Sequence, residues 1–171
     1  MKIGLLSDTH GYMDEVILDH FRDVDEIWHA GDIGTLEVSE QLENFKPFRA
    51  VYGNIDGQDL RIRYPEHNRF EVEGVDVWMT HIGGYPGRYD RKVREEIRKN
   101  PPDVFIAGHS HILKVIRDPK LNLIHLNPGA AGIQGFHKMR TMLRFAIKDG
   151  KLADMEAIEL GKRGALRERM G

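Results

Sequence analysis

The hydrophobic positions in the first half of the chain follow two alternating rhythms. Short, nearly continuous apolar runs over residues 3–7, 26–30 and 48–52 predict buried strands, whereas apolar residues spaced three or four apart over 13–21 and 38–45 predict helices. Strands that alternate with helices favour parallel pairing and right-handed crossover connections. The first half is therefore predicted to form an α/β unit.

The second half of the chain has a pattern dominated by strands. Two alternating runs within residues 69–80, separated by Glu73-Gly74, predict a β-hairpin, and an apolar stripe with a spacing of four predicts a helix over 89–99. Asp149-Gly150 is a strong tight-turn signal. Further strands are predicted over residues 104–107, 113–117, 121–126, 142–148 and from 151 onward. This half therefore contributes mainly sheet.

Composition limits the classes of function. The 171 residues have the length of one ordinary domain, and we expect residues 1–171 to form a single domain with a frayed basic tail over 162–171. The 25 basic and 27 acidic residues give a formal net charge of −2, so no overall charge attracts the chain to nucleic acid or anionic membranes. The absence of cysteine excludes disulfides and thiolate metal sites.

Targeting signals are also missing from the sequence. The apolar run over residues 3–6 is shorter than the core of a signal peptide, which needs roughly 7–15 residues, and no stretch approaches the roughly 20 apolar residues of a membrane span. We therefore expect a cytoplasmic protein with no membrane partner. The oligomeric state stays open, although exposed strand edges in such domains often pair in symmetric dimers.

Side chains that can bind metal occur where the predicted strands end. Asp8 with His10 and His109 with His111 are two residues apart, and on extended backbone such pairs project from the same face. In α/β sheets, ligands bind outside the carboxyl ends of the strands, so we expect these side chains to converge. The candidate metal ligands are Asp8, His10, Asp32, Asn54, His81, His109 and His111.

The donor types narrow the chemistry of this site. Nitrogen and oxygen donors without sulfur suit manganese, nickel, iron, zinc or cobalt, and exclude an all-oxygen calcium or magnesium cage. The set is too large for one ion but suits two divalent ions bridged by a carboxylate, about 3.5–4 Å apart. Two such ions leave the centre net positive, so it attracts an anion such as a phosphate ester. Attack by a metal-bound hydroxide on phosphorus is the reaction that follows.

Five ordered motifs resemble those of the calcineurin-like metallophosphoesterase superfamily, most closely its small prokaryotic YfcE-like phosphodiesterase branch. The motifs are Asp8-Thr9-His10, Gly31-Asp32, Gly53-Asn54-Ile55-Asp56, His81 and Gly108-His109-Ser110-His111. The resemblance implies an α/β four-layer αββα sandwich, with two mixed β-sheets flanked by helices. It also implies that Asp8, His10 and His111 hold a first metal, that Asn54, His81 and His109 hold a second, and that Asp32 bridges them, with manganese favoured.

Two positions depart from the family pattern. Many members carry a histidine after the asparagine, proposed to protonate the leaving group or bind phosphate, whereas this chain has Ile55. Isoleucine can do neither, so good leaving groups are expected to be favoured, and Asp56, which normally orients that histidine, is left to cap the turn or bind a ligand. Ile82 stands where relatives often have glycine.

Other polar residues are weaker candidates. Arg140 and His137 follow the loop 127–132 and are candidates for contact with a substrate phosphate, with a solvated surface position as the alternative. The loop resembles one in the same branch, and either its backbone amides approach the substrate or it is a tight turn. His29 precedes Gly31-Asp32 closely enough to support the metal ligands from behind.

The function that these observations favour is a dinuclear-metal phosphoesterase, preferring diesters over monoesters and acting on a small-molecule phosphoester. Asp32, Asn54 and Asp56 are its candidate catalytic residues. One alternative is a non-catalytic protein-interaction scaffold on the same fold, as in a retromer subunit of the superfamily. The other is a nuclease, against which the near-neutral charge argues, because duplex DNA is bound mainly through basic side chains.

Overall fold

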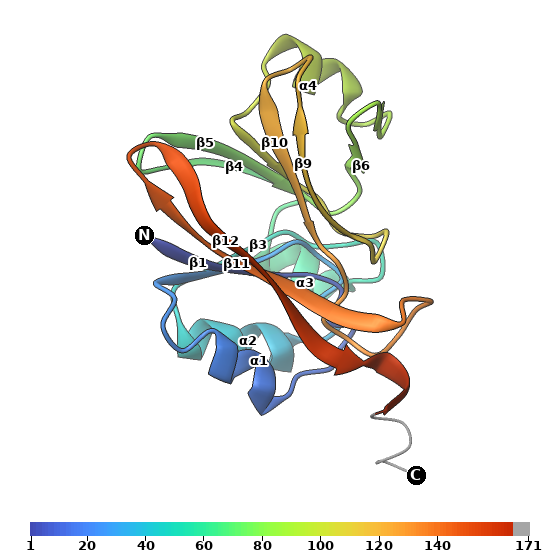
Figure 1. Cartoon of the computed structure of the whole chain (residues 1–171). Coiled ribbons are helices and arrows are strands. Elements are labelled where there is room, and N and C mark those ends of the chain that lie inside the picture. Colours follow the sequence, from blue (N-terminus) through green and yellow to red (C-terminus); the bar gives the residue numbers. More distant parts are fainter. Residues whose placement is uncertain (166–171) are drawn as a thin grey trace.

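The computed structural model describes residues 1–165, which form two five-stranded sheets packed face to face (Figure 1). The first sheet has the strand order β12-β11-β1-β2-β3. Its β1, β2 and β3 run parallel, whereas β11 pairs antiparallel with both β1 and β12. The strands are β1 (Lys2–Leu6), β2 (Glu26–His29), β3 (Phe48–Ala50), β11 (Met139–Lys148) and β12 (Lys151–Lys162).

The second sheet has the order β4-β5-β8-β10-β9 and is also mixed. Its centre is parallel, from β5 through β8 to β10, and each edge strand pairs antiparallel with its neighbour. A small hairpin of β6 (Gly84–Tyr85) and β7 (Arg88–Tyr89) lies outside both sheets. The strands of the second sheet are β4 (His67–Val72), β5 (Val75–Thr80), β8 (Val104–Ile106), β9 (Leu113–Asp118) and β10 (Leu123–Pro128).

The main core lies between the sheets, and β1 shows how the sequence pattern produces it. Ile3 and Leu5 pack in the core between the two sheets, whereas Leu6 packs in the core beneath the helices. Because both faces of β1 are covered, its run is apolar throughout instead of alternating with polar residues. Each fully buried aliphatic side chain of this kind contributes about 1.5–3 kcal/mol to folding.

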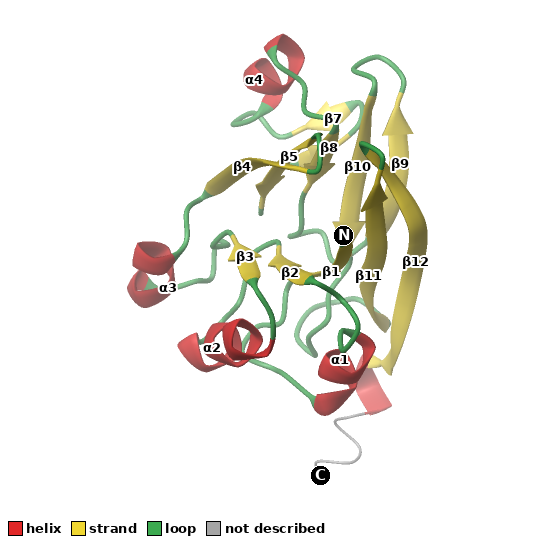
Figure 2. Ribbon diagram, turned by 90° about the vertical axis from the view of Figure 1, so that its left-hand side faces the viewer, coloured by secondary structure: helices red, strands yellow, loops and turns green. Residues whose placement is uncertain are grey.

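Helices cover the outer face of each sheet and complete four layers (Figure 2). Ile17 of α1 and Leu42 of α2 pack on the first sheet, and Ile97 of α4 packs against Phe105 of the second. The four-layer αββα sandwich predicted from the sequence is therefore confirmed. The helices are α1 (Glu15–His20), α2 (Leu36–Phe45), α3 (Gln58–Arg63) and α4 (Arg94–Lys99).

Two details differ from the sequence prediction. The helix predicted over 89–99 begins only at Arg94, because Tyr89 belongs to β7, where its hydroxyl donates a hydrogen bond to Asp118 (2.6 Å). Helix α3 was not predicted, since Leu60 is its single buried residue and no periodic stripe marks it. Strand β12 extends to Lys162, the first residue of the expected tail over 162–171, and residues 166–171 lie outside the described part of the chain.

Truncation of the inter-sheet core should measure how much the sandwich depends on it. Leu126 is fully buried between the sheets. We expect Leu126→Ala to lower the free energy of unfolding by about 2–5 kcal/mol, because the cavity left behind relaxes only partly. Chemical denaturation measures this change. Ile116→Ala on the exposed side of β9 is the control and should change stability by less than about 0.5 kcal/mol; equal losses in both variants would contradict the assignment of the core.

Candidate metal centre

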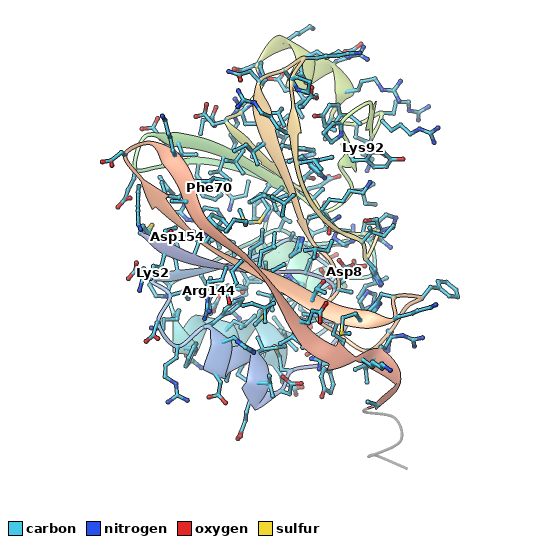
Figure 3. All side chains as sticks on the ribbon, in the orientation of Figure 1. Lys2, Asp8, Phe70, Lys92, Arg144 and Asp154 are labelled. Atoms are coloured by element: carbon cyan, nitrogen blue, oxygen red, sulfur yellow. The ribbon has the colours of Figure 1, made fainter. Side chains whose placement is uncertain are left out.

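All seven candidate metal ligands lie just beyond the carboxyl end of a strand. Asp8 and His10 follow β1, Asp32 follows β2 and Asn54 follows β3 in the first sheet. His81 follows β5, and His109 and His111 follow β8, in the second sheet. The two sheets thus bring their loops together at one rim, and Figure 3 shows Asp8 there, where the sheets meet.

The structure gathers six of these side chains into two adjoining groups. One contains Asp8, His10 and His111, and the other contains Asp32, His81 and His109, with the candidate ligand atoms of each group within 4.8 Å of one another. The groups are in contact, because His10 Nε2 lies 3.4 Å from Asp32 Oδ2 and His81 Nε2 lies 3.8 Å from Asp8 Oδ1. The neighbouring imidazoles His109 and His111 therefore belong to different groups.

The seventh candidate, Asn54, lies at the side of the second group. Asn54 is exposed and lines a pocket together with His81. Gly53, just before it, approaches Asp32 so closely that a Cβ there would lie 2.0 Å from Asp32 Oδ1. A glycine is therefore required at this position to bring the end of β3 against the carboxylate.

Unpartnered atoms show that the donor set fits a bound cation. Asp8 and Asp32 are 0% and 2% exposed, respectively. Three buried atoms in the two groups have no hydrogen-bond partner: Oδ1 of Asp8, Nε2 of His10 and Nε2 of His81. Buried polar atoms are rarely left unpaired, and metal bonds of about 2.0–2.2 Å to such oxygen and nitrogen donors would satisfy all three.

The carboxylates and imidazoles shift one another's pKa values. Burial acts to raise the pKa of Asp8, but the imidazoles of His10 and His111 outweigh it and hold the pKa well below its usual range. Burial likewise acts to raise the pKa of Asp32, and His81 reverses the shift to a lowering. Both side chains are therefore ionised at neutral pH, which concentrates negative charge where a cation would lie.

The backbone at the site is strained in a way that the sequence did not indicate. Five of the seven candidates have positive φ: Asp8 (54°), His10 (47°), Asp32 (54°), His109 (69°) and His111 (60°). The expectation that the two-residue pairs project from extended backbone is therefore wrong. Left-handed conformations of non-glycine residues cost about 1–3 kcal/mol each and cluster at functional sites, where the surrounding contacts impose them.

Buried polar residues behind the ligands tie the loops of the site together. The carboxylate of Asp56 accepts hydrogen bonds from the backbone N–H groups of Ile33 (3.1 Å), Gly34 (2.8 Å) and Gly53 (2.8 Å), so it ties the loops after β2 and β3 together. Asp56 thus braces the loops, as the capping alternative predicted. Burial lowers the pKa of His29 to about 3, and its neutral ring bonds Thr9 Oγ1 (2.9 Å) and accepts from Gly31 N–H (3.1 Å).

Hydrogen bonds also determine which ring nitrogen of His81 and which ring nitrogen of His111 is free to bind a metal ion. His81 Nδ1 donates to the carbonyl of Ala30 (2.7 Å), which leaves the Nε2 lone pair facing Asp32. His137 Nε2 donates to the carbonyl of Gly132 (2.9 Å), so its Nδ1 accepts from His111 Nδ1 (3.1 Å). This leaves His111 Nε2 free, 3.1 Å from Asp8 Oδ1. Nothing in the sequence spacing indicated that His137 contacts a ligand ring.

Arg140 and the loop 127–132 have structural partners. The Arg140 side chain is 2% exposed, with Nε donating to the carbonyl of Ala131 (2.8 Å) and Nη2 lying 3.0 Å from Asp14 Oδ2. Two loop amides, of Ala131 and Gly132, donate to the carbonyls of Ser7 (2.9 Å) and Asp8 (3.1 Å). These contacts anchor the loop to the β1 loop and give no support to a phosphate contact by Arg140.

Residues 1–150 match the family model described as the calcineurin-like phosphoesterase superfamily domain. The chain belongs to this superfamily. A probable metallophosphoesterase of Methanothermobacter thermautotrophicus is 32% identical over 169 residues, covering 94% of each chain. A phosphodiesterase of Methanocaldococcus jannaschii is 28% identical over 147 residues, covering 75% of this chain and 83% of that protein. The family resemblance inferred from the motifs is confirmed.

The phosphoesterase fold is also found in a protein of different name. Vps29 of Chaetomium thermophilum superposes with a TM-score of 0.74 over 95% of this chain and 99% of its own, at 11% identity. An identity this low shows a shared fold alone. Within residues 1–165 of this superfamily member, no helix is long and apolar enough to cross a membrane.

The contact between His137 and His111 predicts an effect on metal binding. His137→Phe keeps the ring shape but removes the acceptor that orients His111, so we expect affinity for Mn²⁺, measured by calorimetry, to fall about 10–100-fold. His67→Phe, at an exposed position on β4, is the matched control and should bind as the unchanged protein does. Affinity within threefold of the unchanged protein in a folded His137→Phe sample would contradict the proposed orientation.

Proposed function

We propose that this phosphoesterase holds two divalent metal ions, with manganese favoured, and hydrolyses a phosphodiester of small-molecule size. The observation that carries the proposal is the contact between two groups of three metal-binding side chains, in which three buried atoms, Asp8 Oδ1, His10 Nε2 and His81 Nε2, have no hydrogen-bond partner. One ion would be held by Asp8, His10 and His111, the other by Asn54, His81 and His109, with Asp32 between them. Such ions stabilise charge on phosphoryl oxygens and lower the pKa of bound water toward neutrality.

The protein's own side chains prepare this site before any substrate arrives. Asp8 and Asp32 are ionised and almost fully buried, so their charge acts in a medium that screens it poorly. The rings of His81 and His111 are held with Nε2 toward the carboxylates by Ala30 and His137. Metal ligands oriented in this way need no rearrangement when an ion binds.

The leaving group receives no proton from the residue after Asn54. Ile55 is 47% exposed beside the site, and its side chain has no group that can donate a proton. Asp56, which could have oriented a histidine there, is committed to three backbone amides. The leaving oxygen must therefore depart as an anion or take its proton from solvent, which favours aryl and other stable leaving groups.

Two pockets adjoin the centre, and this favours a diester. One is lined by Asn54 and His81, and the other by His109 and Ser110. A diester has two organic groups, and each pocket can receive one of them, whereas a monoester would fill only one.

Neither alternative function has an observation of comparable weight. The complete set of donors supports catalysis over a purely structural scaffold, because a scaffold has no need of unpartnered buried donors. The net charge of −2 gives no support to binding of duplex nucleic acid.

Metal removal and one substitution test the proposal together. We expect the metal-free protein to leave bis(4-nitrophenyl) phosphate intact and to hydrolyse it once Mn²⁺ is added. Asp32→Asn should lower kcat/KM more than about 100-fold, because this carboxylate contacts both groups of ligands. Asp19→Asn, an exposed residue of α1, is the control. A folded, metal-loaded protein that hydrolyses no phosphoester would refute catalysis.

A histidine placed at position 55 should change the leaving-group preference. General acids contribute about 10²–10⁴-fold when well placed, so we expect Ile55→His to raise kcat/KM about 10-fold or more for a diester whose leaving group is methoxide and little for one whose leaving group is 4-nitrophenolate. Ile55→Gln, which lacks a titratable proton, controls for polarity. If the ratio of the two substrates stays the same in all three proteins, the leaving-group argument is wrong.

A further inference from the structure

The pocket beside His109 has features that the hydrolysis of a simple diester does not need. It has a volume of about 250 Å³ and begins at His109 and Ser110, so it opens directly from the candidate metal centre. We call it the basic pocket and define it by Tyr85, Arg88, His109, Lys114 and His125, which all line it. It joins the β6–β7 hairpin to β9 and β10 of the second sheet.

Two cations in the basic pocket have no carboxylate partner. Lys114 Nζ lies 3.5 Å from the centroid of the Tyr85 ring, and among residues 1–165 neither Lys114 nor Arg88 forms an ion pair. Asp90 is the single carboxylate of the lining, and its Oδ1 already accepts from the backbone N–H of Lys92 (2.9 Å). The pocket therefore has a surplus of positive charge available to a ligand.

A buried histidine lies behind the two cations of the basic pocket. His125 is 0% exposed and lines the pocket. Burial lowers the pKa of His125 to about 4, so its ring is neutral at neutral pH and adds no charge of its own. The positive charge that a ligand meets in the pocket therefore comes from Lys114 and Arg88.

The pocket on the other side of the centre differs in how its cations are bonded. There, Lys92 pairs with Glu66 (3.2 Å), and Arg61 donates to the carbonyls of Asp56 (2.6 Å) and Asn54 (3.2 Å). Its cations are thus engaged within the protein. Ile82 lines both pockets and forms the wall that they share. A side chain at this position therefore keeps the two organic groups of a diester in distinct surroundings, and among residues 1–165 the cations of the basic pocket donate no side-chain hydrogen bond to a protein oxygen.

We propose that the basic pocket binds a second anionic group of the substrate, and that the preferred substrates are phosphodiesters with a carboxylate or further phosphate on one arm. This inference rests on the proposed function, because the reacting phosphodiester must lie at the metal centre. The second anionic group contacts Lys114 and Arg88, and the arm without charge lies beyond Ile82.

A matched pair of substrates tests this inference. 2-Carboxyethyl 4-nitrophenyl phosphate and propyl 4-nitrophenyl phosphate differ mainly in the terminal carboxylate. We expect the Mn²⁺-loaded protein to show kcat/KM about 10-fold higher or more for the first, because charge-assisted hydrogen bonds are strong in partly buried sites. Lys114→Met keeps the aliphatic stem, and together with Arg88→Met it should reduce the ratio to about one.

Lys92→Met in the neighbouring pocket is the control and should leave the substrate ratio unchanged. Equal rates for the two substrates in the unchanged protein would overturn the inference. So would a preference that survives the double substitution at Lys114 and Arg88. Thermal melts verify that each variant is folded, and the single Lys114→Met variant provides the same comparison if the double variant is not.

Equilibrium binding separates failure of the pocket from failure of catalysis. Calorimetry with 3-phosphonopropionate and propylphosphonate, neither of which can be hydrolysed, should show about 10-fold tighter binding of the first and loss of that difference in the double variant. If this difference in affinity is found but no phosphoester is hydrolysed, the inference about the basic pocket is supported and the proposed catalysis is refuted. If hydrolysis occurs without a difference in affinity, only the inference about the basic pocket is refuted.

Discussion

Two carboxylates buried at the ends of neighbouring parallel strands impose the constraint on which the rest of this centre depends. Asp8 is fully buried and Asp32 nearly so, and unpaired charges there would cost several kcal/mol. Imidazoles of the β1 loop and of two loops of the second sheet surround them, and their contacts keep both carboxylates ionised. The two sheets must therefore meet where their parallel strands end, because only that arrangement supplies nitrogen donors from the second sheet to carboxylates of the first.

Holding these groups together strains the backbone and requires support from buried polar residues. Five ligand candidates occupy left-handed conformations, which neighbouring loops impose. Asp56 ties two of those loops through backbone amides, and His29 fastens Thr9 to Gly31 from behind. These residues bond the backbone and side chains next to the candidate metal ligands and so support the loops that carry them. The energy stored in the strain is offset by the bonds of the loops and, in the proposed function, by bound metal.

The same fold serves proteins of different function, so the site and not the fold must explain activity. Vps29 shares the architecture at an identity of 11%. In this chain, the donor groups are the observation on which the proposed hydrolysis rests. Under that proposal, Ile55 provides no proton for the departing oxygen, and Ile82 separates two pockets whose cations are bonded differently.

Local patterns in the sequence were sufficient to place most strands and to indicate all seven candidate ligands. Apolar periodicity reports burial directly, and parallel strands place their carboxyl ends, with the polar residues that follow, along one edge, where six of the seven candidates lie in two groups. The sequence did not predict the short elements. Helix α3 has a single buried residue and therefore no apolar stripe, and Tyr89, which was predicted to begin a helix, belongs to the β6–β7 hairpin.

Tertiary structure alone decided the geometry of the site. The division of His109 and His111 between two groups, the left-handed backbone beneath them, the contact of His137 with His111 and the burial of Arg140 against Asp14 all join segments distant in sequence. No local pattern encodes such contacts, because a hydrogen bond between distant loops depends on how both sheets pack. The sequence determines which donor atoms the protein has, whereas only the folded structure determines how these atoms are oriented.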